Sequence, residues 1–203
     1  MKWALASLFL AIPIVGGPSL QDGTEVDVDF PVERHQKNKG GSDGAGLCVF
    51  TSIGQAADWH GIEKFVDFRD YMTRFPGGGY PSKVDQYVKR LAQDRGIAVP
   101  RYLQIESNDL EIIADAVQRG HMVSVTYCRS PTGRYGGQRI AHMVNCVAAR
   151  AGPLKAWAIH DNNYVGANQI EWMTETQFKQ TYTGMGGGWA FIWLDPGPPA
   201  PLR

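Results

Sequence analysis

The apolar residues of this chain follow two different spacings, and the change between them limits the folds that it can adopt. Before residue 96, apolar side chains recur at helical spacing over residues 48–60, 62–75 and 82–95. After residue 99, most apolar runs are short and typical of strands, at residues 101–105, 122–128, 141–149, 155–161, 169–173 and 189–194. Two more helices are expected among these strands, over residues 108–119 and 176–182. The pattern predicts an α+β fold with a helical N-terminal half and an antiparallel β-sheet or barrel in the C-terminal half.

Glycine and proline mark the expected ends of the helices. Gly61 and Gly96 follow the first and third helical segments, and glycine commonly ends a helix. Residues 76–81, with the sequence Pro-Gly-Gly-Gly-Tyr-Pro, predict a loop, after which Ser82 can cap the third helix. No long linker separates the two halves. We therefore expect one domain over residues 21–195, with its site at the seam between helices and strands.

The two ends of the chain differ in composition from the part between them. Lys2 precedes an apolar stretch over residues 3–15, and small residues at 16–19 offer a place for cleavage near Leu20, so residues 1–20 are typical of a signal peptide. The apolar stretch is too short to cross a bilayer comfortably. We expect a secreted or periplasmic (extracytoplasmic) protein without a stable membrane anchor after leader removal. Residues 196–203 form a proline-rich tail with no folding signal.

The charge balance excludes some classes of partner. Lys and Arg number 20 and Asp and Glu number 20, so no net attraction to nucleic acid or to an anionic membrane is expected. His35, His60 and His121 have no metal-ligand spacing, and no cluster of cysteine and histidine suggests zinc. The sequence therefore predicts neither a metal nor a cofactor, and no nucleic-acid partner.

Cys48 is the first candidate for chemistry. It follows a glycine-rich run, residues 42–47, and begins a helical segment. Unpaired amides and the positive end of the helix dipole at such a position favour thiolate over thiol. A cysteine in this setting is a candidate nucleophile.

A nucleophilic cysteine needs a base and a group that orients this base. His142 begins an apolar strand, and an imidazole can form an ion pair with a cysteine of lowered pKa. Asp161 ends the next strand, and a turn between antiparallel neighbours would bring this end beside His142. We therefore expect Cys48, His142 and Asp161 to meet.

The other two cysteines, Cys128 and Cys146, could form a disulfide. If their two strands pair as a hairpin, Cys128 lies opposite His142 and Cys146 opposite Ser124. An offset of four residues along a strand is roughly 13 Å, beyond the reach of a disulfide. We predict free thiols.

Several segments, taken in order, resemble the papain-like cysteine peptidases. The resemblance extends over most of the chain after the leader and is carried by Val28–Phe30, Gly44–Ser52, Gly78-Gly79-Tyr80-Pro81, Gly120–Val125, Ala141–Val144 and Trp157–Asp161. Each motif alone is weak. Their order and spacing together make the resemblance specific.

The resemblance implies a role for each matching residue. Cys48 would attack the substrate carbonyl, and His142 would act as the base and then as the acid for the leaving amine. Asp161 would orient His142, in place of the asparagine more usual there. The backbone of Gly78 and Gly79 would pair with an extended substrate. Met143 would line an apolar pocket for a substrate side chain.

The sequence also departs from the family pattern. The resemblance implies that the backbone amide of Cys48 is one donor to the oxyanion. Ser42 stands where a glutamine usually supplies the second, side-chain donor, and Gln36 is the alternative to Ser42. Asp161-Asn162-Asn163 replaces an asparagine-serine-tryptophan run, so the aromatic shield over the orienting residue is missing from this run. Asn162 is the alternative orienting residue. An aspartate at this place is similar to the bacteriocin-leader-processing cysteine peptidases.

The sequence thus predicts a secreted cysteine peptidase that hydrolyses a peptide or protein substrate through a thioester acyl-enzyme. Two alternatives stay open. One is transglutaminase-like or amidase-like acyl transfer by the same three residues. The other is a non-catalytic peptide-binding module on the same fold.

Overall fold

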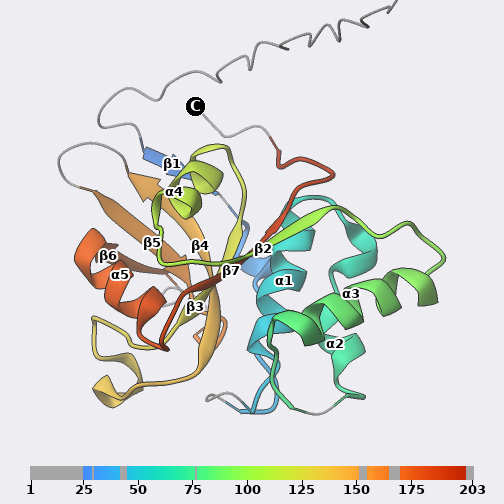
Figure 1. Cartoon of the computed structure of the whole chain (residues 1–203), viewed down its shortest axis with the longest axis horizontal. Coiled ribbons are helices and arrows are strands. Elements are labelled where there is room, and N and C mark those ends of the chain that lie inside the picture. Colours follow the sequence, from blue (N-terminus) through green and yellow to red (C-terminus); the bar gives the residue numbers. More distant parts are fainter. Residues whose placement is uncertain are drawn as a thin grey trace, which may run out of the picture.

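The fold is an antiparallel sheet with helices on both faces (Figure 1). The computed structural model describes residues 25–28, 30–41, 45–75, 77–150, 155–164 and 170–199. The expected leader, residues 1–20, lies outside the described residues, as do residues 42–44. Among the helices of the described part, none is long and apolar enough to cross a membrane.

The sheet has seven strands, and every pair in it is antiparallel. In spatial order the main path is β2 (Tyr102–Glu106), β7 (Trp189–Trp193), β3 (Val123–Tyr127), β4 (His142–Arg150), β5 (Ala156–His160) and β6 (Ile170–Thr174). β1 (Glu25–Asp27) pairs with the last three residues of β4. The path has free ends at β2 and β6, so the sheet is open and a barrel is not confirmed.

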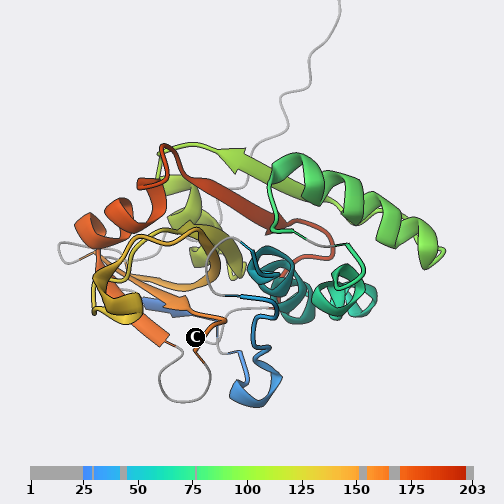
Figure 2. The same cartoon turned by 90° about the horizontal axis from the view of Figure 1, so that it is seen from below.

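The helices form two groups on opposite sides of this sheet (Figures 1 and 2). One group contains α1 (Cys48–Trp59), α2 (Phe68–Met72) and α3 (Pro81–Asp94). The other contains α4 (Glu111–Gln118) and α5 (Glu175–Thr183). Three short 3-10 turns complete the described elements, η1 (Val32–Arg34), η2 (Glu63–Phe65) and η3 (Arg134–Gly137).

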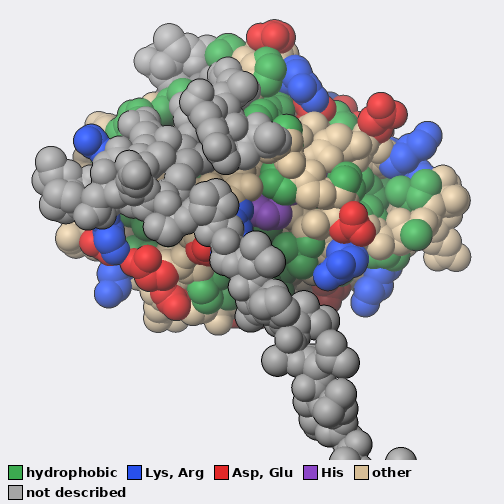
Figure 3. Space-filling model, turned by 90° about the horizontal axis from the view of Figure 1, so that it is seen from above, with side chains coloured by type: hydrophobic (Ala, Val, Ile, Leu, Met, Phe, Trp, Pro, Cys, Tyr) green, Lys and Arg blue, Asp and Glu red, His purple; other side chains and the backbone are tan. Residues whose placement is uncertain are grey.

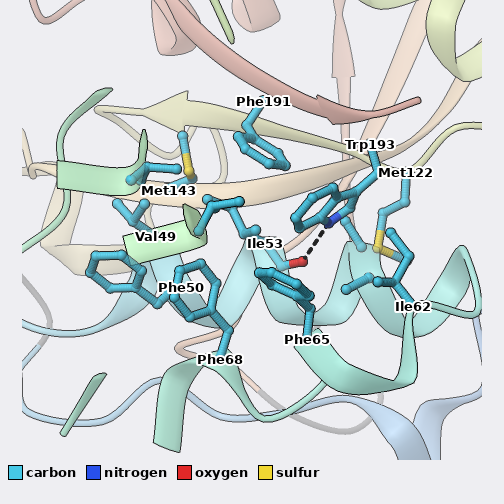
Figure 4. Packing of buried hydrophobic residues seen from close by; sticks show 14 of the residues in the cluster. Val49, Phe50, Ile53, Ile62, Phe65, Phe68, Met122, Met143, Phe191 and Trp193 are labelled. Atoms are coloured by element: carbon cyan, nitrogen blue, oxygen red, sulfur yellow. Dashed lines mark hydrogen bonds between the residues drawn. The ribbon is translucent and has the colours of Figure 1, made fainter. Parts of the chain in front are cut away.

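The sheet is covered by an apolar core on each face, which explains why the sequences of its strands are nearly continuous apolar runs. On one face, Met143 and Phe191 of the sheet pack against Phe50 and Ile53 of α1 (Figure 4). Val144 belongs to the second core, beneath α4 and α5. Neighbouring residues of a strand point to opposite faces, so a sheet buried on both sides needs apolar residues at successive positions. Burial on both faces therefore fixes the register of β4.

A buried hydrogen bond joins the sheet to the first helix inside the first core. The indole Nε1 of Trp193 donates to the carbonyl oxygen of Ile53 at 3.1 Å (Figure 4). The tryptophan is fully buried, so its only polar group needs this partner. The bond fixes α1 against β7.

Most element predictions are correct to within three residues, and the exceptions have physical reasons. The helix expected over residues 62–75 is divided into η2 and α2. The third helix begins at Pro81 with Tyr80 as its N-cap, so Ser82 is not the cap. Proline is favoured at the first helical position because the amide that it lacks would have no partner there.

The cysteine register is also close to the prediction. Tyr127 lies opposite His142 and Val123 opposite Cys146, a shift of one residue from the expected pairing. Cys128 and Cys146 are both free.

Candidate active site

The start of α1 places Cys48 at a helix N-terminus. The amide of Leu47 donates to the carbonyl of Lys39 at 2.9 Å, which closes the preceding loop. Gly46 is packed so closely in this loop that a Cβ there would lie 2.2 Å from the carbonyl oxygen of Gly41. Cys48 is the first helical residue, where the amides have no partner within the helix. These amides and the helix dipole favour a negative charge on the sulfur.

Two neighbouring strands bring His142 and Asp161 together. His142 is the first residue of β4, and Asp161 directly follows β5, its antiparallel neighbour. The ring Nε2 of His142 lies 2.9 Å from Oδ1 of Asp161. Nδ1 of His142 makes no hydrogen bond of normal geometry with the described residues, while the Cys48 thiol interacts with the same ring. The order thiol, imidazole, carboxylate is therefore present.

The electrostatics of this group favour a thiolate–imidazolium pair. Burial alone would raise the pKa of Cys48, but the interaction of the thiol with the ring of His142, with smaller help from backbone groups, outweighs it and lowers this pKa. Burial would lower the pKa of His142, but Asp161 and Cys48 outweigh it and raise this pKa to about 9. Cys48 is 4% exposed and Asp161 is 0% exposed. Attraction between charges is stronger in such a poorly solvated place.

Asp161 carries its negative charge inside the molecule. Burial would raise the pKa of this carboxyl, but the charged ring of His142, the amide of Asn163 and the hydroxyl of Tyr135 outweigh it and lower the pKa. The amide of Asn163 donates to Oδ1 at 3.0 Å, and the hydroxyl of Tyr135 donates to Oδ2 at 2.8 Å. Arg134 adds a positive charge 3.6 Å from Oδ2. These contacts compensate the buried carboxylate.

Asn162, the alternative orienting residue, has a different place. Its Nδ2 donates to the carbonyl of Met143 at 2.9 Å, to the carbonyl of Cys48 at 3.2 Å and to Oγ of Ser52 at 2.9 Å. The side chain therefore joins α1 to β4, and Asp161 is the residue that contacts His142. Sequence reasoning missed Ser52, whose Oγ also donates to the carbonyl of Met143 at 3.0 Å. Its spacing of four residues from Cys48 on one helix face was the available signal.

The glycines expected to contact substrate border the nucleophile. Gly79 packs against Val49, the neighbour of Cys48, so closely that a Cβ on Gly79 would lie 2.5 Å from the Cβ of Val49. Nζ of Lys83 donates to the carbonyls of Gly77 and Gly78, both at 3.0 Å. The loop is thus fixed beside the start of α1. Its pairing with a substrate stays a prediction.

Met143 is a correction to the sequence analysis. Its side chain is fully buried in the core with Val49 and Ile53, so it has no surface that a substrate could contact (Figure 4). His142 and Met143 are neighbours in β4 and point to opposite faces.

The candidate oxyanion donors can be compared in part. Nε2 of Gln36 donates to the carbonyl of Val66 at 3.0 Å, so this amide is already engaged. Ser42 lies outside the described residues. The backbone amide of Cys48 is at the start of α1, where helix geometry leaves it available.

The remaining histidines lie away from this group or are packed in pairs. The ring of His160 contacts that of His35, with centroids 5.2 Å apart, and His60 contacts His121 at 5.1 Å. Among the described residues, no three His, Cys, Asp or Glu side chains could together hold a metal ion. On the face seen in Figure 3, described basic and acidic side chains are interspersed.

No protein-family model matches this chain, and no curated protein matches its sequence. Among solved structures, the chain is similar to a Bacillus anthracis protein named as a C39-like peptidase. The TM-score is 0.53 and the sequence identity 11%, over 86% of this chain and 99% of that chain. The proform of the Amb a 11 cysteine protease, a ragweed pollen allergen, has a TM-score of 0.47 and 16% identity, over 92% of this chain and 63% of that one.

The first similarity decides the fold. The chain shares the fold of that Bacillus anthracis protein. At 11% identity the similarity concerns the fold alone.

Proposed function

We propose that this protein is an exported cysteine peptidase that hydrolyses peptide bonds with Cys48, His142 and Asp161. One observation carries the proposal: His142 contacts both the Cys48 thiol and the Asp161 carboxylate, and its pKa is raised while that of Cys48 is lowered. The shared fold with a C39-like peptidase supports a peptide substrate. The signal peptide expected over residues 1–20 is the basis for proposing that the enzyme acts outside the cytoplasm.

The proposed reaction has two steps. The Cys48 thiolate attacks the carbonyl carbon of the peptide bond, and the amine leaves with the proton held by His142, which gives a thioester. A water molecule then loses a proton to His142 and attacks the thioester, which releases the acid and restores the thiol. The Cys48 amide would stabilise the oxyanion in both steps. Asp161 keeps the ring of His142 oriented and favours its charged form.

The proposal is tested by labelling Cys48 and by measuring peptide hydrolysis. A thiol-directed epoxide should add one inhibitor mass to the protein, and peptide mapping should locate it on Cys48. The matched control is Cys128→Ala, which removes another buried thiol and should keep both the labelling and the activity. Cys48→Ala should lose both while its thermal unfolding stays close to that of the wild type.

The same assay separates the alternatives. Release of the free acid from a peptide library supports a peptidase. Incorporation of an added amine in preference to water would favour acyl transfer instead. A folded wild-type protein whose Cys48 is neither labelled nor required for any turnover would overturn the proposal and leave a binding module.

A further inference from the structure

The loop between β3 and β4 contains a backbone strain that sequence analysis did not anticipate. Tyr135 has φ 63° and ψ 24°, and it is the only non-glycine residue with positive φ in the described part of the chain. A bulky side chain rarely adopts this left-handed conformation, which costs free energy unless the surroundings impose it. Glycines at 133, 136 and 137 also have positive φ, so left-handed residues lie on both sides of Tyr135. Such strain raises the question of what Tyr135 does.

A buried carboxylate holds the start of this loop. Glu171 of β6 is 2% exposed and accepts hydrogen bonds from the hydroxyls of Tyr127 and Ser130, both at 2.6 Å. It also accepts from the backbone amide of Thr132 at 3.2 Å. The segment just before Tyr135 is therefore fixed to the sheet. This attachment allows the strained turn to persist.

The strained turn brings Tyr135 onto the candidate active site. Its hydroxyl donates to Oδ2 of Asp161 at 2.8 Å, while His142 lies on the other oxygen, Oδ1, at 2.9 Å. Its ring lies edge-on to that of His142, with centroids 6.0 Å apart and planes at 63°. Nδ2 of Asn163 donates to the Tyr135 hydroxyl at 3.0 Å, which leaves the hydroxyl proton directed to Asp161.

The geometry points to Tyr135 as the residue that positions the Asp161 carboxylate and shields its contact with His142 from water. This inference rests on the proposed function of Cys48, His142 and Asp161. Tyr135 belongs to a loop that lies 26 residues before Asp161 in the chain. Tyr135 contacts no reacting atom and acts through Asp161, so it is a positioning residue.

Loss of the hydroxyl has a defined electrostatic consequence. The hydrogen bond from Tyr135 stabilises the charged form of Asp161, so without it the carboxyl holds its proton up to a higher pH. A protonated Asp161 no longer stabilises the imidazolium, and the thiolate of Cys48 then loses its partner charge. The pH above which Cys48 is reactive should therefore rise. A hydrogen bond to a charged group corresponds to about one pH unit.

The test measures the rate of Cys48 alkylation by iodoacetamide as a function of pH in Tyr135→Phe. This rate reports the thiolate directly and needs no peptide substrate. The matched control is Tyr164→Phe, because the Tyr164 ring contacts Tyr135 at 5.5 Å and its hydroxyl makes no hydrogen bond with the described residues. Thermal unfolding of each variant shows that it is folded during the assay. Where a peptide substrate is cleaved, kcat and KM are measured as well.

We expect Tyr135→Phe to move the acid limb of the alkylation profile up by about one pH unit, and to lower kcat about fivefold with KM unchanged. Tyr164→Phe should leave both unchanged. Asn163→Ala keeps Tyr135 but removes the donor to its hydroxyl, so it should shift the alkylation profile less and in the same direction. This variant replaces Tyr135→Phe in the test if Tyr135→Phe does not fold. Profiles of both variants that coincide with the wild type would overturn the inference. A shifted profile in a protein that cleaves no peptide would uphold the role of Tyr135 and reject the peptidase.

Discussion

Asp161 places a full negative charge against the imidazole of His142, with Oδ1 2.9 Å from the ring Nε2. The pKa of His142 is raised to about 9 because its bonds to Asp161 and Cys48 outweigh burial. The buried carboxylate is in turn held by the amide of Asn163 and the hydroxyl of Tyr135. At the scale of single residues, the charge on Asp161 and its hydrogen-bond donors determine whether Cys48 and His142 form a thiolate–imidazolium pair.

Asp161→Asn should separate orientation from charge. The amide oxygen can still accept from His142, but the charge that raises its pKa is lost, so the alkaline limb of the activity profile should move to lower pH. We expect kcat/KM to fall about tenfold, and by at least another tenfold in Asp161→Ala, which removes the acceptor too.

The control is Asp115→Asn, which removes a carboxylate from an exposed pair with Arg119 and should change nothing measurable. If Asp161→Asn kept the wild-type pH profile, the carboxylate would not be the source of the raised pKa of His142.

At the scale of elements, the position of the nucleophile depends on how α1 is packed. Ser52, on the buried face of α1, donates to β4 and accepts from Asn162, which follows β5. The first turn of α1 contacts the loop that contains Gly79. These contacts come from three different parts of the chain. The N-terminus of α1 is therefore located by its neighbours as well as by its own helical pattern.

Gly79→Ala tests the contact between the loop and α1. The added Cβ would lie 2.5 Å from the Cβ of Val49, so one of the two segments must move. We expect a loss of about 2 kcal/mol in the free energy of unfolding and a clear loss of activity, since Val49 adjoins Cys48. Urea unfolding and kcat/KM measure the two effects.

The double variant Gly79→Ala with Val49→Ala makes the argument specific. Val49→Ala keeps the Cβ but removes Cγ1 and Cγ2, which would lie 2.6 and 2.8 Å from the added Cβ, so it should restore part of the lost stability and the two changes should not be additive. Gly197→Ala, which meets nothing within 4 Å, is the matched control. Additive losses would mean that the two residues are not in contact as described.

At the scale of the whole molecule, burial keeps several histidines in an uncharged form. Burial lowers the pKa of His35 and His60 to about 4. Burial, aided by the positive charge of His35, lowers that of His160 to about 3. Each of these pKa values is below the pKa of the same histidine in the unfolded chain. Between the folded and unfolded pKa values, the unfolded state therefore binds more protons than the folded state.

The fold should therefore lose stability as the pH falls. Stability from these three histidines is present above about pH 6.5 and decreases as the pH approaches about 4, where the folded-state groups begin to titrate. His142 acts in the opposite direction, because its pKa is raised to about 9 and its contribution is lost only as the pH rises through that value. We expect a lower urea midpoint at about pH 4.5 than at about pH 7.

His160→Phe keeps an aromatic ring beside His35 and Phe30 but cannot be protonated. It should reduce the difference between the two urea midpoints and change the midpoint at neutral pH less. An acid sensitivity equal to that of the wild type in both His160→Phe and His35→Phe would show that this pair does not cause it.

Local patterns predicted a large part of the fold. The bounds of the helix that begins at Cys48, of β4, which begins at His142, and of β5, which ends just before Asp161, were predicted to within a residue. The apolar spacing that marks these elements is a property of consecutive residues. Antiparallel pairing also predicted that Asp161 lies beside His142, whereas the approach of Cys48 to His142 was an expectation from the chemistry that a nucleophilic cysteine needs. The buried place of Met143 did not follow, since its packing against Val49 and Ile53 of α1 joins residues far apart in the chain.

The amino-acid sequence by itself determined the types and order of the elements and the nature of the three groups proposed for catalysis. Only the tertiary structure decided that Asp161 and not Asn162 contacts His142, and that Tyr135 lies on the same carboxylate. The reason is physical. Periodicity and helix-end chemistry act between near neighbours, whereas these contacts join Tyr135 to Asp161 across 26 residues, through a left-handed turn that a buried glutamate holds in place.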